Sequence, residues 1–261
     1  MIARRRLLAW MTLPAAWPAR AADAPLRIAT PPGPQAALFE HVRLLAAARG
    51  VEVRLERRDD VSAVEADLRR GALDAAAFDD GVAFDDANRR QRTGLAVAAA
   101  SFTLPMGLYS RRLVAPRQVR DGETVAVPAE PAGLARALVL LQNFGLIELR
   151  DDVGLHATLR DVTANRRGLR LVPTALDRLV DALWRDALVA MDFTVATRAG
   201  LEPARDSIGI EDARTPFGGV LGVRRDRLDE PWLRTLVGVL HGPEMKRFAF
   251  ERFHDSVRRP W

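Results

Sequence analysis

Short apolar runs alternate with amphipathic segments along the chain from residue 25 onward. Runs of about four to eight apolar residues predict buried strands, and apolar residues three or four positions apart predict helices. An alternation of strands and helices is typical of α/β architecture. The predicted strands cover residues 26–30, 51–55, 73–78, 95–100, 124–127, 169–172, 187–191, 208–210 and 220–223. The predicted helices include residues 36–48, 62–70 and 131–144.

A hydroxyl residue stands three positions before an acid at two predicted helix starts. Ser62 precedes Glu65, and Thr174 precedes Asp177. In a capping box the hydroxyl accepts a hydrogen bond from a free backbone N–H, and the acidic side chain bonds back to the cap residue. We therefore expect Ser62 and Thr174 to cap their helices.

Two predicted strands end in a similar way. The strand at 73–78 ends in Phe78 and is followed by Asp79, and the strand at 187–191 is followed by Asp192 and Phe193. Ligands of open α/β sheets bind beyond the carboxyl ends of the strands. Two such ends that face each other predict a cleft between two lobes. The alternative is that the aspartates only cap the helices that follow.

The first residues are typical of an export signal. Three arginines at residues 4–6 precede a short apolar run at 7–17, and Ala19-Arg20-Ala21 fits a small-x-small cleavage site. We expect residues 1–22 to be a removable signal peptide and the mature protein to be periplasmic. The chain has no cysteine, which excludes disulfides, thiolate metal sites and a lipid anchor on an N-terminal cysteine.

Net charge and the lack of catalytic motifs argue against several classes of function. The formal charge is +5, but four arginines and no acid lie within residues 1–21, so the remainder carries +1. A nearly neutral chain gives no electrostatic reason to bind nucleic acid. The four histidines are scattered without metal-ligand spacing, and no nucleophile elbow or phosphate-binding loop occurs. We therefore expect no enzyme activity, no metal and no cofactor.

Residues 124–147, which read TVAVPAEPAGLARALVLLQNFGLI, strongly resemble the NlpA-type methionine-binding family of ABC-importer proteins. The resemblance continues at residues 149–155 and 199–206, and it extends to 73–78. It implies a periplasmic-binding-protein-like fold with two lobes joined by two crossover hinges. Residues 23–109 plus 213–261 would form lobe one, and residues 110–212 would form lobe two. It also implies delivery of a small amino acid, methionine or a derivative, to a membrane permease driven by an ATPase.

The resemblance places the ligand carboxylate at Arg136. Arg136 is the only charged residue between Pro131 and Ile147, and it lies early in a predicted helix, where the positive helix end favours an anion. The alternative is that Arg136 and Asn143 form a solvated stripe. Asp192 is expected to hold the ligand ammonium, because a buried charge needs a partner.

The predicted pocket departs from the family pattern. Asp192 and Gly219 replace two asparagines of the family, Asp79-Asp80 replaces a Gln-His pair, and Ala83 replaces a tyrosine. These changes add negative charge and are expected to leave room at Gly219 and Ala83, so we expect methionine not to be the tightest ligand. The predicted ligand-binding residues are Arg136, Asp192, Phe78, Phe102, Asp79, Asp80, Gly219 and Phe193.

Two other functions fit the same fold. A periplasmic ligand-sensing module would signal to a membrane receptor and transport nothing, and a periplasmic enzyme would need a nucleophile or metal site that the sequence does not place. We expect a monomer that is not anchored by lipid.

Overall fold

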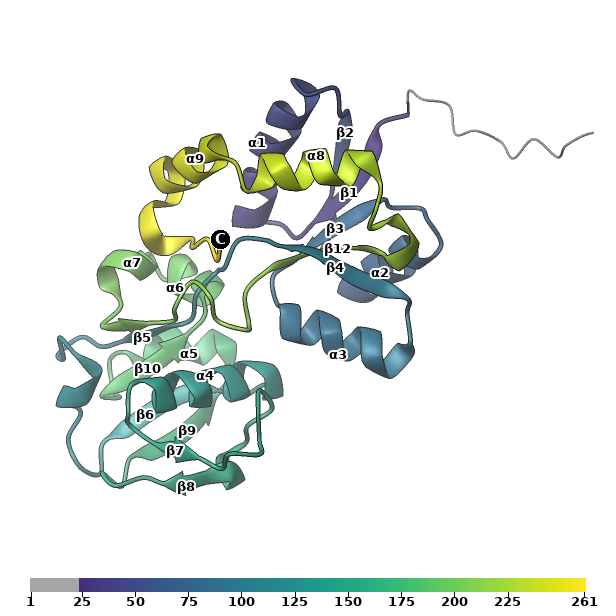
Figure 1. Cartoon of the computed structure of the whole chain (residues 1–261). Coiled ribbons are helices and arrows are strands. Elements are labelled where there is room, and N and C mark those ends of the chain that lie inside the picture. The colour runs from purple at the N-terminus through teal and green to yellow at the C-terminus, as the bar shows by residue number, and fades with distance from the viewer. Residues whose placement is uncertain (1–23) are drawn as a thin grey trace, which may run out of the picture.

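The computed structural model describes residues 24–261 and contains two five-stranded sheets, one in each of two lobes (Figure 1). The expected signal peptide, residues 1–22, lies outside the described residues. In lobe one the strand order is β2-β1-β3-β12-β4, with β12 antiparallel to its neighbours β3 and β4. Its strands are β1 (Leu26–Thr30), β2 (Val53–Arg57), β3 (Ala75–Phe78), β4 (Leu95–Ala100) and β12 (Val220–Arg224). Its helices are α1 (Pro34–Ala47), α2 (Val61–Arg69), α3 (Gly81–Gln91), α8 (Pro231–Leu240) and α9 (Pro243–Phe253).

Lobe two holds the sheet with strand order β11-β5-β10-β6-β9, in which β10, β6 and β9 run parallel. A short antiparallel pair, β7 with β8, lies beside it (Figure 1). The strands are β5 (Gly107–Tyr109), β6 (Thr124–Pro128), β7 (Glu148–Leu149), β8 (Val162–Ala164), β9 (Arg170–Thr174), β10 (Leu188–Met191) and β11 (Gly209–Ile210). The helices are α4 (Pro131–Asn143), α5 (Leu176–Ala182), α6 (Phe193–Arg198) and α7 (Pro203–Asp206).

Helices cover both faces of each sheet, so the buried strands are apolar on both sides. Alternate residues of lobe one pack against α1, α8 and α9 or against α2 and α3, as the period of two along a strand requires. The first set includes Ile28, Ala75, Ala77, Leu221 and Val223, and the second includes Ala29, Ala76 and Phe78. In lobe two, α4 covers one face and α5 with α6 covers the other. The α/β fold predicted from the sequence is confirmed.

Two crossovers join the lobes. The first runs from β4 to β5, and the second from β11 to β12. Because β5 pairs with β10 and β11, it belongs to the sheet of lobe two, so the first crossover lies before Gly107 and the expected boundary after residue 109 is a few residues late. The C-terminal segment also reaches this region, where Arg258 forms a β-bridge with Thr103.

The two predicted capping boxes are wrong. Asp60 caps α2 by accepting a hydrogen bond from the Ala63 amide at 3.0 Å, so Ser62 lies inside the helix. Ala175 is the N-cap position of α5, and Thr174 is still part of β9, where its backbone pairs with β6. Asp60 takes the N-cap position because an aspartate side chain accepts a hydrogen bond from a free backbone amide at a helix start at least as well as serine does.

No helix within residues 24–261 is long and apolar enough to cross a membrane.

Candidate ligand-binding site

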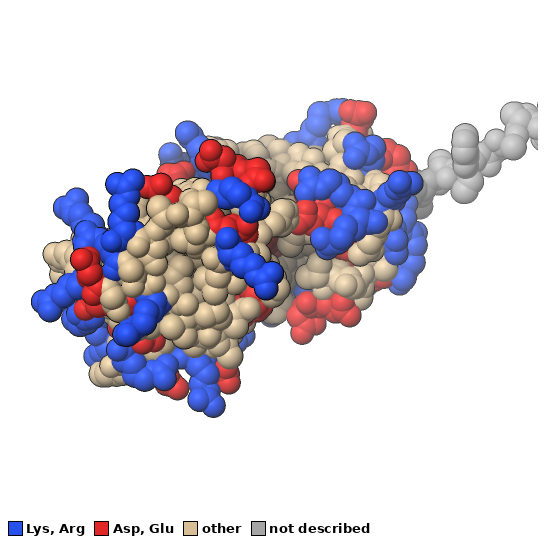
Figure 2. Space-filling model, turned by 90° about the horizontal axis from the view of Figure 1, so that it is seen from below, with Lys and Arg blue, Asp and Glu red and all other residues tan. Residues whose placement is uncertain are grey.

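A cavity of about 420 Å³ lies between the two lobes. The space-filling view shows a furrow between the lobes at this level (Figure 2). Lobe one contributes residues of α3 and its N-terminal turn, and lobe two contributes the start of α4 and the loop at 155–158. His156 of lobe two lies 3.4 Å from Asp86 of lobe one across this cavity, between Nε2 and Oδ2. Residues of both lobes therefore line this cavity.

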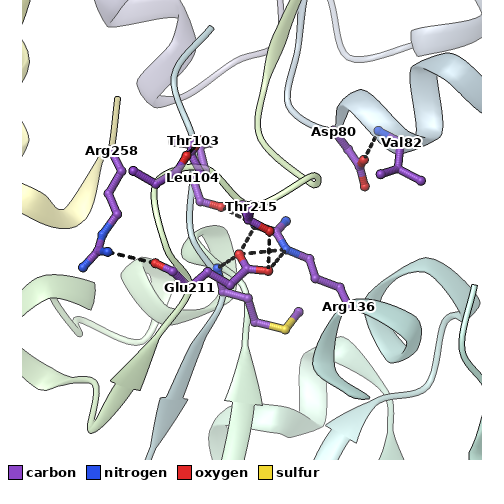
Figure 3. Close-up of polar contacts among 10 residues, drawn as sticks. Asp80, Val82, Thr103, Leu104, Arg136, Glu211, Thr215 and Arg258 are labelled. Atoms are coloured by element: carbon purple, nitrogen blue, oxygen red, sulfur yellow. Dashed lines mark hydrogen bonds and ion pairs between the residues drawn. The ribbon is translucent and has the colours of Figure 1, made fainter. Parts of the chain in front are cut away.

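Arg136 of α4 points toward Glu211 next to this cavity (Figure 3). Its Nε donates to Oε1 and Oε2 of Glu211 at 2.9 and 3.0 Å, and its Nη2 donates to Oε2 at 2.5 Å. Nη2 also donates to the Leu104 carbonyl at 2.8 Å. Leu104 lies on the first crossover and Glu211 on the second, so Arg136 ties both connections to lobe two.

The Arg136 side chain is only 11% exposed and that of Glu211 is 5% exposed. The alternative that Arg136 belongs to a solvated stripe is therefore wrong. Burial by itself would lower the pKa of Arg136, but the hydrogen bonds and charge of Glu211, with smaller effects from Asp80 and Asp192, raise it. The guanidinium stays charged.

A guanidinium has five N–H groups, and Glu211 and Leu104 use those on Nε and Nη2. Nη1 makes no hydrogen bond with any residue of the described chain. Two donors thus remain for a ligand oxygen. The two-pronged pairing expected with a ligand carboxylate is already made with Glu211, so a ligand would be met by Nη1.

Asp80 and Asp192 cap the helices that follow their strands. Asp80 accepts from the amides of Val82 and Ala83 at 2.8 and 3.1 Å, and Asp192 accepts from the Val195 amide at 2.7 Å. The capping alternative is confirmed for Asp192, whereas the cap after β3 is Asp80 and not the expected Asp79. Capping does not remove them from the site, because both charges act on Arg136.

Asp79 lies at the end of β3 and is largely buried. Its Oδ1 has no hydrogen-bond partner among the described residues. Burial raises the pKa of Asp79 to about 6; the Gln35 amide and the charge of Arg136 act against this rise, while Asp192 and Asp80 add to it. Carboxylates thus outnumber the single buried guanidinium at this end of the cleft.

We expect the stability of the protein to fall between pH 4 and pH 6 through Asp79. Because the pKa of Asp79 is raised in the folded state, its contribution is full below the ordinary value near 4 and is lost as the pH rises through about 6. The loss is about 1–3 kcal/mol. Asp79→Asn should therefore unfold at higher urea concentration than the parent protein at pH 7.5, but not at pH 4. The exposed Asp121→Asn is the control, and equal midpoints for parent and Asp79→Asn at pH 7.5 would contradict the assignment.

The three phenylalanines predicted for the pocket lie apart. Phe78 packs on Phe84, with ring centroids 4.7 Å apart, and lines a second cavity between α2 and α3. Phe102 is fully buried against Trp261, and Phe193 is buried in the same core cluster. Neither Phe102 nor Phe193 lines the two cavities, because core contacts already cover both rings.

Gly219 is buried where three segments meet. A Cβ atom there would lie 2.5 Å from the Phe102 carbonyl oxygen and 2.9 Å from the Phe78 carbonyl oxygen. The expectation that Gly219 leaves spare room is wrong, because backbone fills the space. Ala83 differs, since it lines both cavities.

Sequence reasoning missed Glu211 and Phe217. The ring centroid of Phe217 lies 5.6 Å from the guanidinium carbon of Arg136, and Phe217 lines the inter-lobe cavity. Glu211 follows the short strand β11, 75 residues after Arg136, and no spacing rule links positions so far apart. The only sequence signal was the resemblance of the neighbouring residues 199–206.

Comparison with known proteins adds independent information. A family model described as NlpA lipoprotein matches residues 26–261. The D-methionine-binding lipoprotein MetQ of Escherichia coli (strain K12) is 31% identical over 214 residues, which are 81% of this chain and 79% of that protein.

Solved structures agree with this. A periplasmic substrate-binding protein of an ABC transporter from Coxiella burnetii is 31% identical with a TM-score of 0.75, covering 90% of this chain and 99% of the other. A nutrient-binding protein from Burkholderia cenocepacia bound to methionine is 27% identical with a TM-score of 0.75, covering 90% of this chain and 100% of the other. The periplasmic-binding-protein-like fold is therefore confirmed, and the chain belongs to the NlpA lipoprotein family.

Proposed function

We propose that this protein is the extracytoplasmic solute-binding component of an ABC importer and binds a small amino-acid-like ligand between its lobes. Its family consists of substrate-binding proteins rather than enzymes. The observation that carries the proposal for this chain is Arg136, a buried guanidinium beside the inter-lobe cavity with two donors free on Nη1. A ligand carboxylate accepts from Nη1, and the ligand ammonium faces Asp192.

The partners in this proposal are a membrane permease and its ATPase. The similar proteins named above include a component of an ABC transporter, which supports transport over the alternative of a sensing module. In this proposal the mature protein is periplasmic. It acts as a monomer.

We expect methionine to bind more weakly than a more cationic amino acid. Asp80 and Ala83 line the inter-lobe cavity, and Asp79 lines the cavity that adjoins it, so a neutral thioether meets carboxylates without a nearby cation and an unfilled gap. Thermal-shift measurements with a panel of amino acids test both statements, because a ligand that binds only the folded state raises the melting temperature. No shift with any amino acid would contradict the proposed function, whereas the largest shift with methionine would contradict only the specificity.

We also expect the ligand to close the lobes about the two crossovers. Arg136 contacts both crossovers through Leu104 and Glu211, so a ligand held by Arg136 acts on the segments that must bend. Small-angle scattering should show a smaller radius of gyration with ligand than without it. An unchanged radius at saturating ligand would contradict closure.

A further inference from the structure

A second cavity, of about 300 Å³, lies between α2 and α3 beyond the ends of β1 and β3. We call it the side cavity. It shares Asp80, Ala83 and Arg90 with the inter-lobe cavity, so the two spaces adjoin along α3. A ligand that occupied both spaces would pass Asp80 and Ala83, at the start of α3.

Two buried acceptor atoms of the side cavity have no partner among the described residues, and a third group there is a carboxylate without an ion pair. Thr30 is 1% exposed, and its Oγ1 makes no hydrogen bond with the described residues. Oδ1 of Asp79 is also buried and makes no hydrogen bond with them. Glu65 of α2 is 5% exposed, and its carboxylate forms no hydrogen bond or ion pair with residues 24–261. Buried polar groups in proteins are nearly always paired, so two buried atoms without partners in one cavity, beside a carboxylate that has no ion pair, indicate a missing donor.

The charges around the side cavity leave an excess of carboxylates. Glu65, Asp79 and Asp80 line it, together with the guanidinium groups of Arg58 and Arg90. Arg58 is already paired with Glu56 and Asp67, at 3.4 and 3.2 Å. Arg90 is exposed and forms no ion pair within the described part of the chain, so one cation stands against three acids.

Burial raises the pKa of Glu65, and the more distant charges of Arg69 and Arg90 only partly oppose this. Burial also raises the pKa of Asp79. Both carboxyl groups thus lack a close positive partner in the folded chain. A bound cation would supply one.

The rest of the side cavity is apolar. Its walls include Val64, Ala77, Phe78, Phe84 and Ala87. Such walls suit a short methylene chain, which leaves water at about 0.8 kcal/mol for each buried CH₂. Apolar walls with acceptors and no free buried donor match an alkyl chain that ends in a donor group.

We propose that the side cavity is a subsite for the cationic end of the ligand, so that the ligand is an α-amino acid with a distal ammonium or guanidinium group. The assignment rests on the proposed function, since the α-carboxylate is held at Arg136. An ammonium offers three donors and no acceptor, which matches Thr30 Oγ1, Asp79 Oδ1 and the Glu65 carboxylate.

Calorimetry at pH 7.5 with both enantiomers of ornithine, lysine and arginine, and with norleucine and methionine, tests this subsite. Norleucine matches the chain of lysine but lacks the charge. We expect at least one basic amino acid to bind about tenfold or more tightly than norleucine, as a charged hydrogen bond provides. Glu65→Gln keeps the size of the side chain and should remove that advantage while leaving norleucine binding unchanged. The matched control, Glu148→Gln, changes an exposed glutamate of lobe two and should alter neither.

The outcomes separate the subsite from the proposed function. Norleucine or methionine binding as tightly as every basic amino acid would overturn the subsite and leave the proposed function standing. An undiminished preference for basic amino acids in Glu65→Gln would overturn the subsite too. If no amino acid binds but butylguanidine, which has no carboxylate, binds in a manner that depends on Glu65, the subsite stands and the amino-acid proposal fails. If nothing in the panel binds, both fail.

Discussion

Arg136→Ala is expected to weaken ligand binding and to destabilise the fold. The lost charged contact with the ligand corresponds to about 2–5 kcal/mol of binding free energy. The free energy of unfolding falls because the Glu211 side chain, which is only 5% exposed, keeps its charge after its partner Arg136 is removed. Removing one partner of a buried pair typically costs about 3–5 kcal/mol. Calorimetry measures the first effect, and urea unfolding measures the second.

The source of the instability can be isolated with a second change. In the Arg136→Ala background, Glu211→Gln removes the unpaired charge, so it should recover much of the unfolding free energy without restoring ligand binding. Arg150→Ala is the matched control, because Arg150 forms ion pairs with Asp152 and Asp161 but its side chain is more than half exposed. If Arg136→Ala were as stable as Arg150→Ala, the buried pair would have no structural importance.

Gly219→Ala is expected to destabilise the protein by about 1–3 kcal/mol or more through overpacking. The new methyl group would lie 2.5 Å from the carbonyl oxygen of Phe102 and 2.9 Å from that of Phe78. Both atoms belong to the backbone, so β3 or the first crossover must move. Because these segments carry Asp79 and lead to Leu104, we also expect weaker ligand binding. Thermal unfolding and calorimetry measure the two effects.

The same chain provides a control for this glycine. Gly238 lies on the exposed side of α8, and a Cβ atom there meets nothing within 4 Å. Gly238→Ala should stabilise the protein by about 0.5–1 kcal/mol, because alanine loses less backbone freedom in a helix. A Gly219→Ala protein as stable as Gly238→Ala would show that the backbone at Gly219 yields easily.

Local pattern predicted the fold well where burial is continuous. Within the predicted strands 73–78 and 187–191, residues 75–78 and 188–191 are apolar throughout, and they form the central strands β3 and β10, which are covered on two faces. Arg136 could be singled out because it is the only charged residue of an apolar helix, and the family resemblance assigned it to the ligand carboxylate. In both cases the information lies within one element.

Contacts between distant elements could not be read in the same way. β5 has three residues and owes its existence to pairing with β10 and β11, so no local period marks it. Glu211 is defined as part of the site only by its position opposite Arg136. The lack of a side chain at Gly219 suggested spare room in the pocket. The backbone of two other segments fills that space, and the local sequence does not show this.

We propose above all that Arg136 holds a small amino-acid-like ligand between the lobes. Mass spectrometry of the purified mature protein, first native and then denatured, tests it most directly by identifying any small molecule that is carried through purification. The account predicts an α-amino acid or a close derivative, bound to the parent protein and absent from a folded Arg136→Ala, Glu211→Gln protein. A bound molecule without a carboxylate, or one retained equally by that double variant, would contradict it.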